Sequence, residues 1–247
     1  AELEVFAHGA LCIAYSGRCL ISRYMTGRDS NQGNCAHPCR WDYHLVEAKR
    51  PGEYFPVHET PEGTEILSSK DLCLLPKMRE YVEAGVDAFK LEGRMKSVYY
   101  VANVTRIYKD ALETIRSGGD FDAKLPFWME ELDLVSHRPF TQDLFHEFEK
   151  EFEPVPYITK AQYMGFCVDQ TAEPNVSTVR ASNPIKPGMT LDAIFPIDNS
   201  KIIDGQVTVL DISENGRPTD MARPDRICDI RFDRPVAQNA LFRKRNQ

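Results

Sequence analysis

The sequence predicts an α/β part followed by an all-β part. In the first part, a strand-like run close to residue 1 is followed by two helical patterns that alternate with strand-like segments. After about residue 156, the chain consists of short strand-like segments separated by Gly, Pro and Asn turns. Alternating strands and helices favour parallel β/α units, and evenly spaced short strands favour a small antiparallel β-barrel.

The elements of the α/β part follow from local patterns. The run LEVFAHGALC is typical of a buried strand that leads into a loop, and residues 23–62 are polar and aperiodic, which predicts a long loop region. The stretch EILSSKDLCLLPKMREYVEAGVDAFKLEGR indicates strand, loop, helix and strand, with Gly85 as the helix C-cap. A second helix ends at Gly118 and Gly119, and its apolar residues recur at helical spacing: Val101, Val104, Ile107, Tyr108, Ala111, Leu112 and Ile115.

The distribution of charge suggests where the two parts meet. The chain has a net charge of -7, and residues 120–156 hold ten acidic and three basic residues, which accounts for all of it. We predict a β/α domain with a Cys-rich loop over residues 1–120, an acidic linker or helical segment over 121–156, and a β-barrel domain over 157–247. The remaining residues sum to zero charge, so net charge neither favours nor excludes RNA as a partner.

Two or three β/α units cannot close a barrel, because the strands of such a fold need neighbours on both sides. Either the chain is the C-terminal part of something longer, or its first strand pairs in an unusual way. The sequence contains no apolar run of membrane-spanning length and no signal-peptide pattern, so we expect a cytoplasmic protein without a membrane partner. Its oligomeric state is left open.

Four of the seven cysteines lie within one stretch of about thirty residues, at Cys12, Cys19, Cys35 and Cys39. Six, fifteen and three residues separate them. Sets of four thiolates select an iron–sulfur cluster or zinc, and this spacing does not separate the two. Cys73 is held in reserve as a ligand, although packing is its simpler role. Cys167 and Cys228 fall on predicted barrel strands and are interpreted as packing residues. For the four clustered cysteines, the alternative to metal binding is ordinary burial as free thiols.

The motif KLEGRMKS places Lys90, Glu92, Arg94 and Lys96 at the end of a predicted strand and in the loop after it. In β/α folds this end hosts chemistry, and the cations suit a carboxylate or phosphate ligand. The alternative is a solvated turn with internal ion pairs. Among the histidines, His8 is a candidate proton donor or a hydrogen-bonding neighbour of the cysteines. The terminal RKR run, residues 243–245, is interpreted as a solvated end that could also grip RNA.

These residues resemble a known family. EVFAHGALCIAYSGRCLIS resembles the signature of the U32 peptidase family, and NQGNCAHPCRWDY, SSKDL, KLEGRMKS and VSHRPFT resemble its later landmarks in order. The last ninety or so residues look like the C-terminal β-barrel of that family. The resemblance implies the C-terminal part of a TIM-like β/α barrel, followed by a small antiparallel β-barrel, and it implies that the other half of the β/α barrel precedes the signature or is supplied by a partner.

The resemblance also implies a chemistry. Members of the family act in oxygen-independent hydroxylation and carry a [4Fe–4S] cluster on four cysteines, which here would be Cys12, Cys19, Cys35 and Cys39. This sequence looks most like the branch that hydroxylates wobble uridine in tRNA and uses prephenate. Glu92 is a catalytic candidate beside His8. The substrate-binding candidates are Arg18, Arg40, Lys90, Arg94 and Lys96, of which Arg18 and Arg40 would also offset the charge of a cluster.

Two other functions are kept open. One is a U32-type peptidase of the collagenase-like kind. His58–Glu59 lacks the second histidine of a zinc-protease motif, but a Cys–His nucleophile, for example Cys19 with His8 or His37, is conceivable. The other is an RNA-binding module stabilised by zinc.

Overall fold

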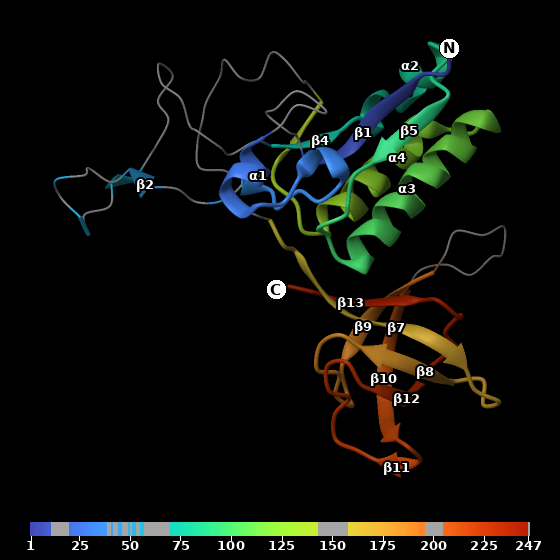
Figure 1. The fold of residues 1–247 in the computed structure, drawn as a ribbon. Coiled ribbons are helices and arrows are strands. Elements are labelled where there is room, and N and C mark those ends of the chain that lie inside the picture. The colour runs from blue at the N-terminus through green and yellow to red at the C-terminus, as the bar shows by residue number, and fades with distance from the viewer. Residues whose placement is uncertain are drawn as a thin grey trace. The chain divides into compact units, whose positions relative to one another are not determined.

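The computed structural model describes residues 1–10, 20–38, 41, 44–45, 49, 51–52, 55–56, 70–142, 158–195 and 205–246. These residues fall into two compact units. The first contains residues 1–94 and 137–158, and the second contains residues 95–136 and 159–247. Helices α3 and α4 therefore belong to the same unit as the C-terminal strands. Figure 1 labels these elements along the chain. The predicted boundaries at residues 120 and 156 stay a prediction.

The first unit is built on a four-stranded sheet in the order β5-β1-β4-β6. Its strands are β1 (Glu4–Ala10), β4 (Asp71–Cys73), β5 (Ala88–Leu91) and β6 (Phe140–Thr141). Strand β1 pairs in parallel with β5 but antiparallel with β4, and β4 pairs in parallel with β6. The sheet is therefore mixed. The antiparallel β1–β4 pair matches the alternative that the first strand pairs in an unusual way, and a β/α barrel is not formed by the described residues.

Short elements complete the first unit. They are α1 (Ile21–Thr26), the 3-10 turn η1 (Ser30–Gln32), the pair β2 (His44–Leu45) and β3 (Phe55–Pro56), the 3-10 turn η3 (Leu75–Lys77) and α2 (Met78–Glu83). The C-cap residue of α2 is Ala84, and Gly85 lies one position beyond it, with φ of +85° and its N–H donated to the Val82 carbonyl. The predicted glycine therefore ends the helix, one residue after the cap. Glycine is favoured here because other residues rarely adopt positive φ.

The second unit begins with the predicted helices. Helix α3 (Val98–Arg116) starts at Ser97, whose hydroxyl accepts the N–H of Tyr100, and α4 (Phe121–Asp133) starts at Asp120, whose carboxylate accepts the N–H of Ala123. The two helices pack together. Asn103 donates across this contact to the Glu131 carbonyl oxygen at 2.8 Å. No described helix combines the length and the apolar character needed to cross a membrane.

The remaining strands form a closed barrel. They are β7 (Ala161–Gln170), β8 (Val176–Ala181), β9 (Thr190–Ile194), β10 (Gly205–Glu214), β11 (Arg217–Pro218), β12 (Ile227–Phe232) and β13 (Leu241–Arg245). Their order is β11-β10-β12-β8-β7-β13-β9, and a further β10–β9 pairing closes the ring of six, with β11 attached to β10. Each pairing in the ring is antiparallel. The predicted small antiparallel β-barrel is thus confirmed.

The barrel core is apolar and contains the two cysteines that the sequence assigns to packing. Cys167 on β7 and Cys228 on β12 are buried and free of disulfides. Burial raises the pKa of both thiols, so they remain protonated near neutral pH. These two residues therefore contribute packing rather than reactivity.

A buried ion-pair network joins α3 and α4 to the barrel within this unit. Arg243 on β13 makes a bidentate pair with Glu131 of α4, with Nη2–Oε1 at 2.7 Å and Nη1–Oε2 at 2.8 Å. Its Nε also donates to Asp192 of β9 at 3.2 Å. Burial alone would lower the pKa of Arg243, but its hydrogen bonds to Glu131 outweigh burial and raise that pKa. The interpretation of Arg243 as part of a solvated RNA-gripping end is therefore wrong.

Asp192 should make barrel stability depend on acidity. Burial acts to raise its pKa, but hydrogen bonds from Arg245 and Arg243 outweigh that effect and lower the pKa. A depressed folded-state pKa stabilises the fold above the unfolded value, about 4, and this contribution is lost as pH falls through the folded value. We expect Asp192→Asn to flatten the dependence of unfolding free energy on pH below about 4, measured by urea titration. Asp220→Asn is the control, because Asp220 is exposed. If the unfolding free energy of Asp192→Asn depended on pH as steeply as that of the wild type, the prediction would be contradicted.

Candidate functional site

The candidate site lies in the first unit, where β1 and β5 end. The backbone N–H of Glu92, one residue after β5, donates to the His8 carbonyl oxygen at 2.9 Å. Gly9 has φ of +125°, and a Cβ placed on it would lie 2.7 Å from the Glu92 carbonyl oxygen. Only glycine permits this close approach. The sequence thus brings the motif KLEGR directly against the end of the first strand.

Three of the predicted site residues, Cys35, Glu92 and Arg94, are linked by hydrogen bonds. Nη2 of Arg94 donates to the carbonyl oxygen of Cys35 at 3.2 Å, across a sequence separation of 59 residues. The backbone N–H of Arg94 in turn donates to Oε1 of Glu92 at 3.2 Å. Oε2 of Glu92 is buried, and no described residue donates a hydrogen bond to it. The structure therefore brings Cys35, Glu92 and Arg94 into one connected group.

The other cations of the motif lie differently. Lys90 is exposed on β5, as an anion-binding residue would be. Lys96 belongs to the second unit, where its Nζ donates to the Ser136 carbonyl oxygen at 2.9 Å and lies 4.9 Å from the ring centroid of Tyr100. Lys96 is thus partly committed to structural contacts. Arg18 and Arg40 fall outside the described residues.

The surroundings of Cys35 fit the ligand of an iron–sulfur cluster. The Cys35 thiol is half-buried, and its sulfur accepts the backbone N–H of His37 at 3.3 Å. Hydrogen bonds of this kind tune the thiolates that hold iron–sulfur clusters, so Cys35 fits such a ligand. Cys12, Cys19 and Cys39 lie outside the described residues. Within the described ranges, no group of three or more His, Cys, Asp or Glu side chains is arranged to hold a metal ion.

Cys73 and His8 share one face of the sheet. The register pairs His8 of β1 with Cys73 of β4, and residues that face each other across a pair point to the same side. Both are almost completely buried: His8 is 0% exposed and Cys73 is 1% exposed. A thiol in this position is not accessible to a peptide substrate. The reserve ligand therefore has the burial of a packing residue.

Sequence reasoning missed a buried polar group on the same sheet. Asp71, two residues before Cys73, accepts the backbone N–H of Arg138 at 3.3 Å. His137 stacks on Phe140 with ring centroids 4.1 Å apart. These residues come from VSHRPFT and SSKDL, two of the segments that carry the family resemblance. A histidine and an arginine beside a short apolar strand are the signal that could have pointed to them.

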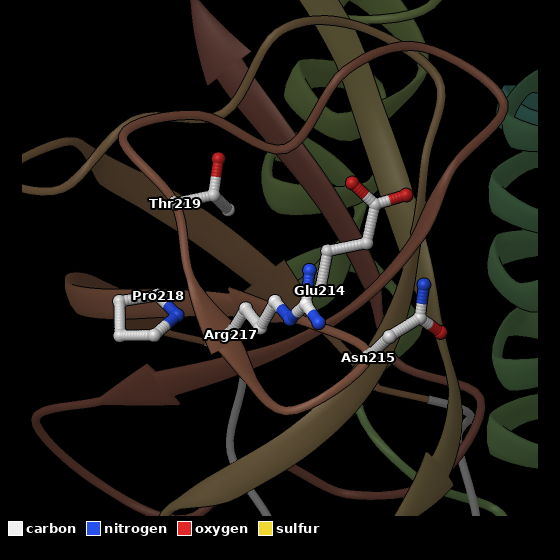
Figure 2. Close-up of a pocket in the computed structure, with 5 residues that line it drawn as sticks. All are labelled: Glu214, Asn215, Arg217, Pro218 and Thr219. Atoms are coloured by element: carbon white, nitrogen blue, oxygen red, sulfur yellow. The ribbon is translucent and has the colours of Figure 1, made fainter.

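A hollow on the barrel lies elsewhere, at the β10–β11 hairpin (Figure 2). It is lined by Glu214, Asn215, Arg217, Pro218 and Thr219. Asn215 and Gly216 both have positive φ, as the two central residues of a type I′ hairpin turn do. The lining is polar and contains no residue that the sequence predicts for catalysis or metal binding. It is a feature of the turn rather than a candidate catalytic site.

Comparison with known proteins identifies relatives of this chain. It is 32% identical over 251 residues to tRNA hydroxylation protein P1 of Bacillus subtilis, covering 98% of this chain and 58% of that protein. It is 31% identical over 242 residues to tRNA hydroxylation protein P of Escherichia coli, covering 80% and 52%. A protein of Porphyromonas gingivalis named collagenase is 38% identical over 139 residues, covering 56% and 32%.

The chain spans little more than half the length of the first two of these relatives. The sequence model of peptidase family U32 matches residues 1–153, which include β1, the Cys-rich segment and the motif KLEGR. The predicted resemblance is confirmed by this match. Because it covers more than half of the chain, the chain belongs to peptidase family U32.

Proposed function

We propose that this chain is part of a cytoplasmic RNA-modifying enzyme that hydroxylates uridine in tRNA without molecular oxygen, with prephenate as co-substrate. The observation that carries the proposal is the similarity to a tRNA hydroxylation protein over 98% of the chain, which includes the Cys-rich segment and the barrel together. Similarity restricted to the β/α part would not distinguish RNA modification from other activities of the family.

The proposed cofactor is a [4Fe–4S] cluster held by Cys12, Cys19, Cys35 and Cys39. Support comes from Cys35, whose half-buried sulfur accepts an N–H and whose peptide is bound by a cation. When bound, such a cluster supplies one-electron redox chemistry. The burial of Cys73 favours Cys39 as the fourth ligand, because Cys73 lies within a strand of the sheet.

The chain's own groups would then bind and orient the substrate. Lys90 is placed to attract the carboxylates of a co-substrate or the phosphates of RNA, because its ammonium group is exposed near the end of β5. Glu92 has one carboxylate oxygen bound by the Arg94 N–H and a second without a donor among the described residues. Because that second oxygen is buried, we assign Glu92 to holding Arg94 in place rather than to proton transfer with the substrate.

The peptidase names in the family favour a second candidate, a cysteine-dependent hydrolase. The described residues offer His8 opposite Cys73 for this role. Both side chains are buried in the sheet, and a nucleophile must reach its substrate. The Cys73–His8 pair therefore does not support hydrolysis, and the predicted nucleophile Cys19 lies outside the described residues.

Anaerobic purification with iron and sulfide analysis tests the proposal. We expect the wild-type chain to be brown, with about four iron and four sulfide per chain, and Cys35→Ser to lose most of the iron. Cys228→Ser, which removes a buried barrel thiol, is the matched control and should keep it. Mass spectrometry of tRNA nucleosides, from cells that depend on the full-length protein, should show loss of hydroxylated uridine in the Cys35→Ser strain only.

Other outcomes would overturn the proposal. A colourless chain with one zinc would indicate a zinc-stabilised RNA-binding module. Cleavage of gelatin by the colourless chain would indicate the peptidase, provided that the activity is lost on replacing a cysteine.

A further inference from the structure

The segment that carries Cys35 is a compact turn over residues 29–38, here called the Cys35 loop. Inside it, Asn34 and Gln32 donate their N–H groups to the Asp29 carbonyl oxygen, at 3.1 Å and 3.3 Å. Its later part is bound to α1, where the buried Ser22 hydroxyl accepts the N–H of Ala36 at 3.0 Å. The loop therefore has its own hydrogen-bonded shape and one anchor from the preceding helix.

Arg94 provides a second anchor from a distant part of the chain. Its Nη2 donates to the Cys35 carbonyl oxygen, and its Nη1 lies 3.4 Å from the position that a Cβ on Gly33 would occupy. The guanidinium thus lies along the backbone of the loop on both sides of Asn34. The peptide that it binds is that of the cysteine whose sulfur accepts the His37 N–H.

The position of Arg94 is itself fixed by the end of the sheet. Its backbone N–H donates to the Glu92 carboxylate, and the Glu92 N–H donates to the carbonyl oxygen of His8 in β1. A chain of contacts therefore runs from β1 through Glu92 and Arg94 to the Cys35 peptide. Each link joins residues of the first unit.

We propose that Arg94 is a positioning residue for the Cys35 thiol. It holds the Cys35 peptide against the end of β5 and fixes the direction of the sulfur. This role differs from the anion binding that the sequence predicts for Arg94, because the guanidinium edge used for the loop is not free for a carboxylate. The proposal rests on the proposed function only for the statement that this thiol ligates a cluster.

The chemistry of the contact requires arginine. A guanidinium is planar and presents two Nη groups, so one can bind the carbonyl while the other lies against the glycine. A lysine ammonium keeps the charge but has neither the reach nor the second group. Arg94→Lys therefore removes the guanidinium contacts with the loop but keeps the positive charge. Lys90→Ala, in the same motif, is the control for the loss of a positive charge.

The test uses the metal-free full chain under argon and measures two rates. The first is alkylation of Cys35 by iodoacetamide, followed by peptide mass spectrometry, with the buried Cys73, Cys167 and Cys228 as internal references. The second is deuterium uptake by peptides of the Cys35 loop. We expect Arg94→Ala to raise both rates about fivefold, as expected for the loss of one exposed hydrogen bond, and Arg94→Lys to raise them nearly as much. Lys90→Ala should leave both at the wild-type values.

Equal rates in wild type and Arg94→Ala would overturn the proposal. If Arg94→Ala also bound prephenate or tRNA more weakly, Arg94 would instead be a substrate ligand. Faster rates in Arg94→Ala support positioning even if the wild-type chain binds no iron. In that case the proposed function fails and the positioning role stands.

Discussion

Replacing Arg243 with methionine is expected to lower the free energy of unfolding by about 3–5 kcal/mol. The Arg243 side chain is only 3% exposed, and it pairs with Glu131, which is 4% exposed. Removing the guanidinium leaves the Glu131 carboxylate buried with part of its neutralising charge gone, since among the described residues Arg106 alone still pairs with it, at 3.0 Å. The hydroxyl of Tyr99, 3.2 Å from Arg243, loses a donor as well.

The measurement is chemical denaturation of the full chain, followed by fluorescence and circular dichroism. Arg231→Met on the same barrel is the matched control, because Arg231 also binds two acidic residues but is 40% exposed. Exposed ion pairs contribute little, so this variant should unfold at nearly the wild-type midpoint. Similar losses in the two variants would contradict the assignment of Arg243 to a buried, structure-determining pair.

Replacing Gly9 with alanine is expected to destabilise the first unit by about 3 kcal/mol or more. The new Cβ would lie 2.7 Å from the carbonyl oxygen of Glu92 and 2.8 Å from its Cβ, and the backbone has φ of +125°. Because Glu92 cannot yield without separating β1 from β5, the strand ends should move apart. Arg94 would lose its support, and the RNA modification proposed for the full-length protein should fall with it.

Unfolding curves and deuterium uptake of the β1 and β5 peptides measure this effect. Gly85→Ala is the control within the same unit, since Gly85 has φ of +85° but no atom within 4 Å of the added Cβ. It should cost about 1 kcal/mol, the backbone part alone. An effect of Gly9→Ala no larger than that of Gly85→Ala would show that the close approach to Glu92 does not matter.

Local patterns predicted the long helix and the barrel strands, but they indicated loops where most of α1 and the strand β4 lie, and they did not give every pairing. The spacing of Val104, Ile107 and Ala111 predicts α3, and these residues are buried in the structure. The antiparallel β1–β4 pair was less accessible to such reasoning, because the long connection from Ala10 to Asp71 can return in either direction. Strand patterns state which face is buried but not the direction of a neighbour.

The candidate site shows the same limit. The sequence identifies Cys35 and Arg94 separately, but a hydrogen bond across 59 residues depends on tertiary structure. Arg243 was interpreted as a solvated end because a charge run does not reveal which of its members has a buried partner. Glu131 lies 112 residues earlier, in the stretch predicted as an acidic linker or helical segment. Charge patterns predict partners within a helix turn, and these two contacts lie far beyond that range.

The closed ring of the barrel restricts how this unit can recognise a partner. Each of the six described strands in the ring pairs with a strand on both of its sides, so none of the six is an edge strand of an open sheet. Capture of an extended peptide by β-augmentation needs an open edge, which this ring does not offer. A nucleic acid bound by the barrel would have to contact its side chains and turns. Variants that change those groups should alter the affinity for the nucleic acid without separating the paired strands.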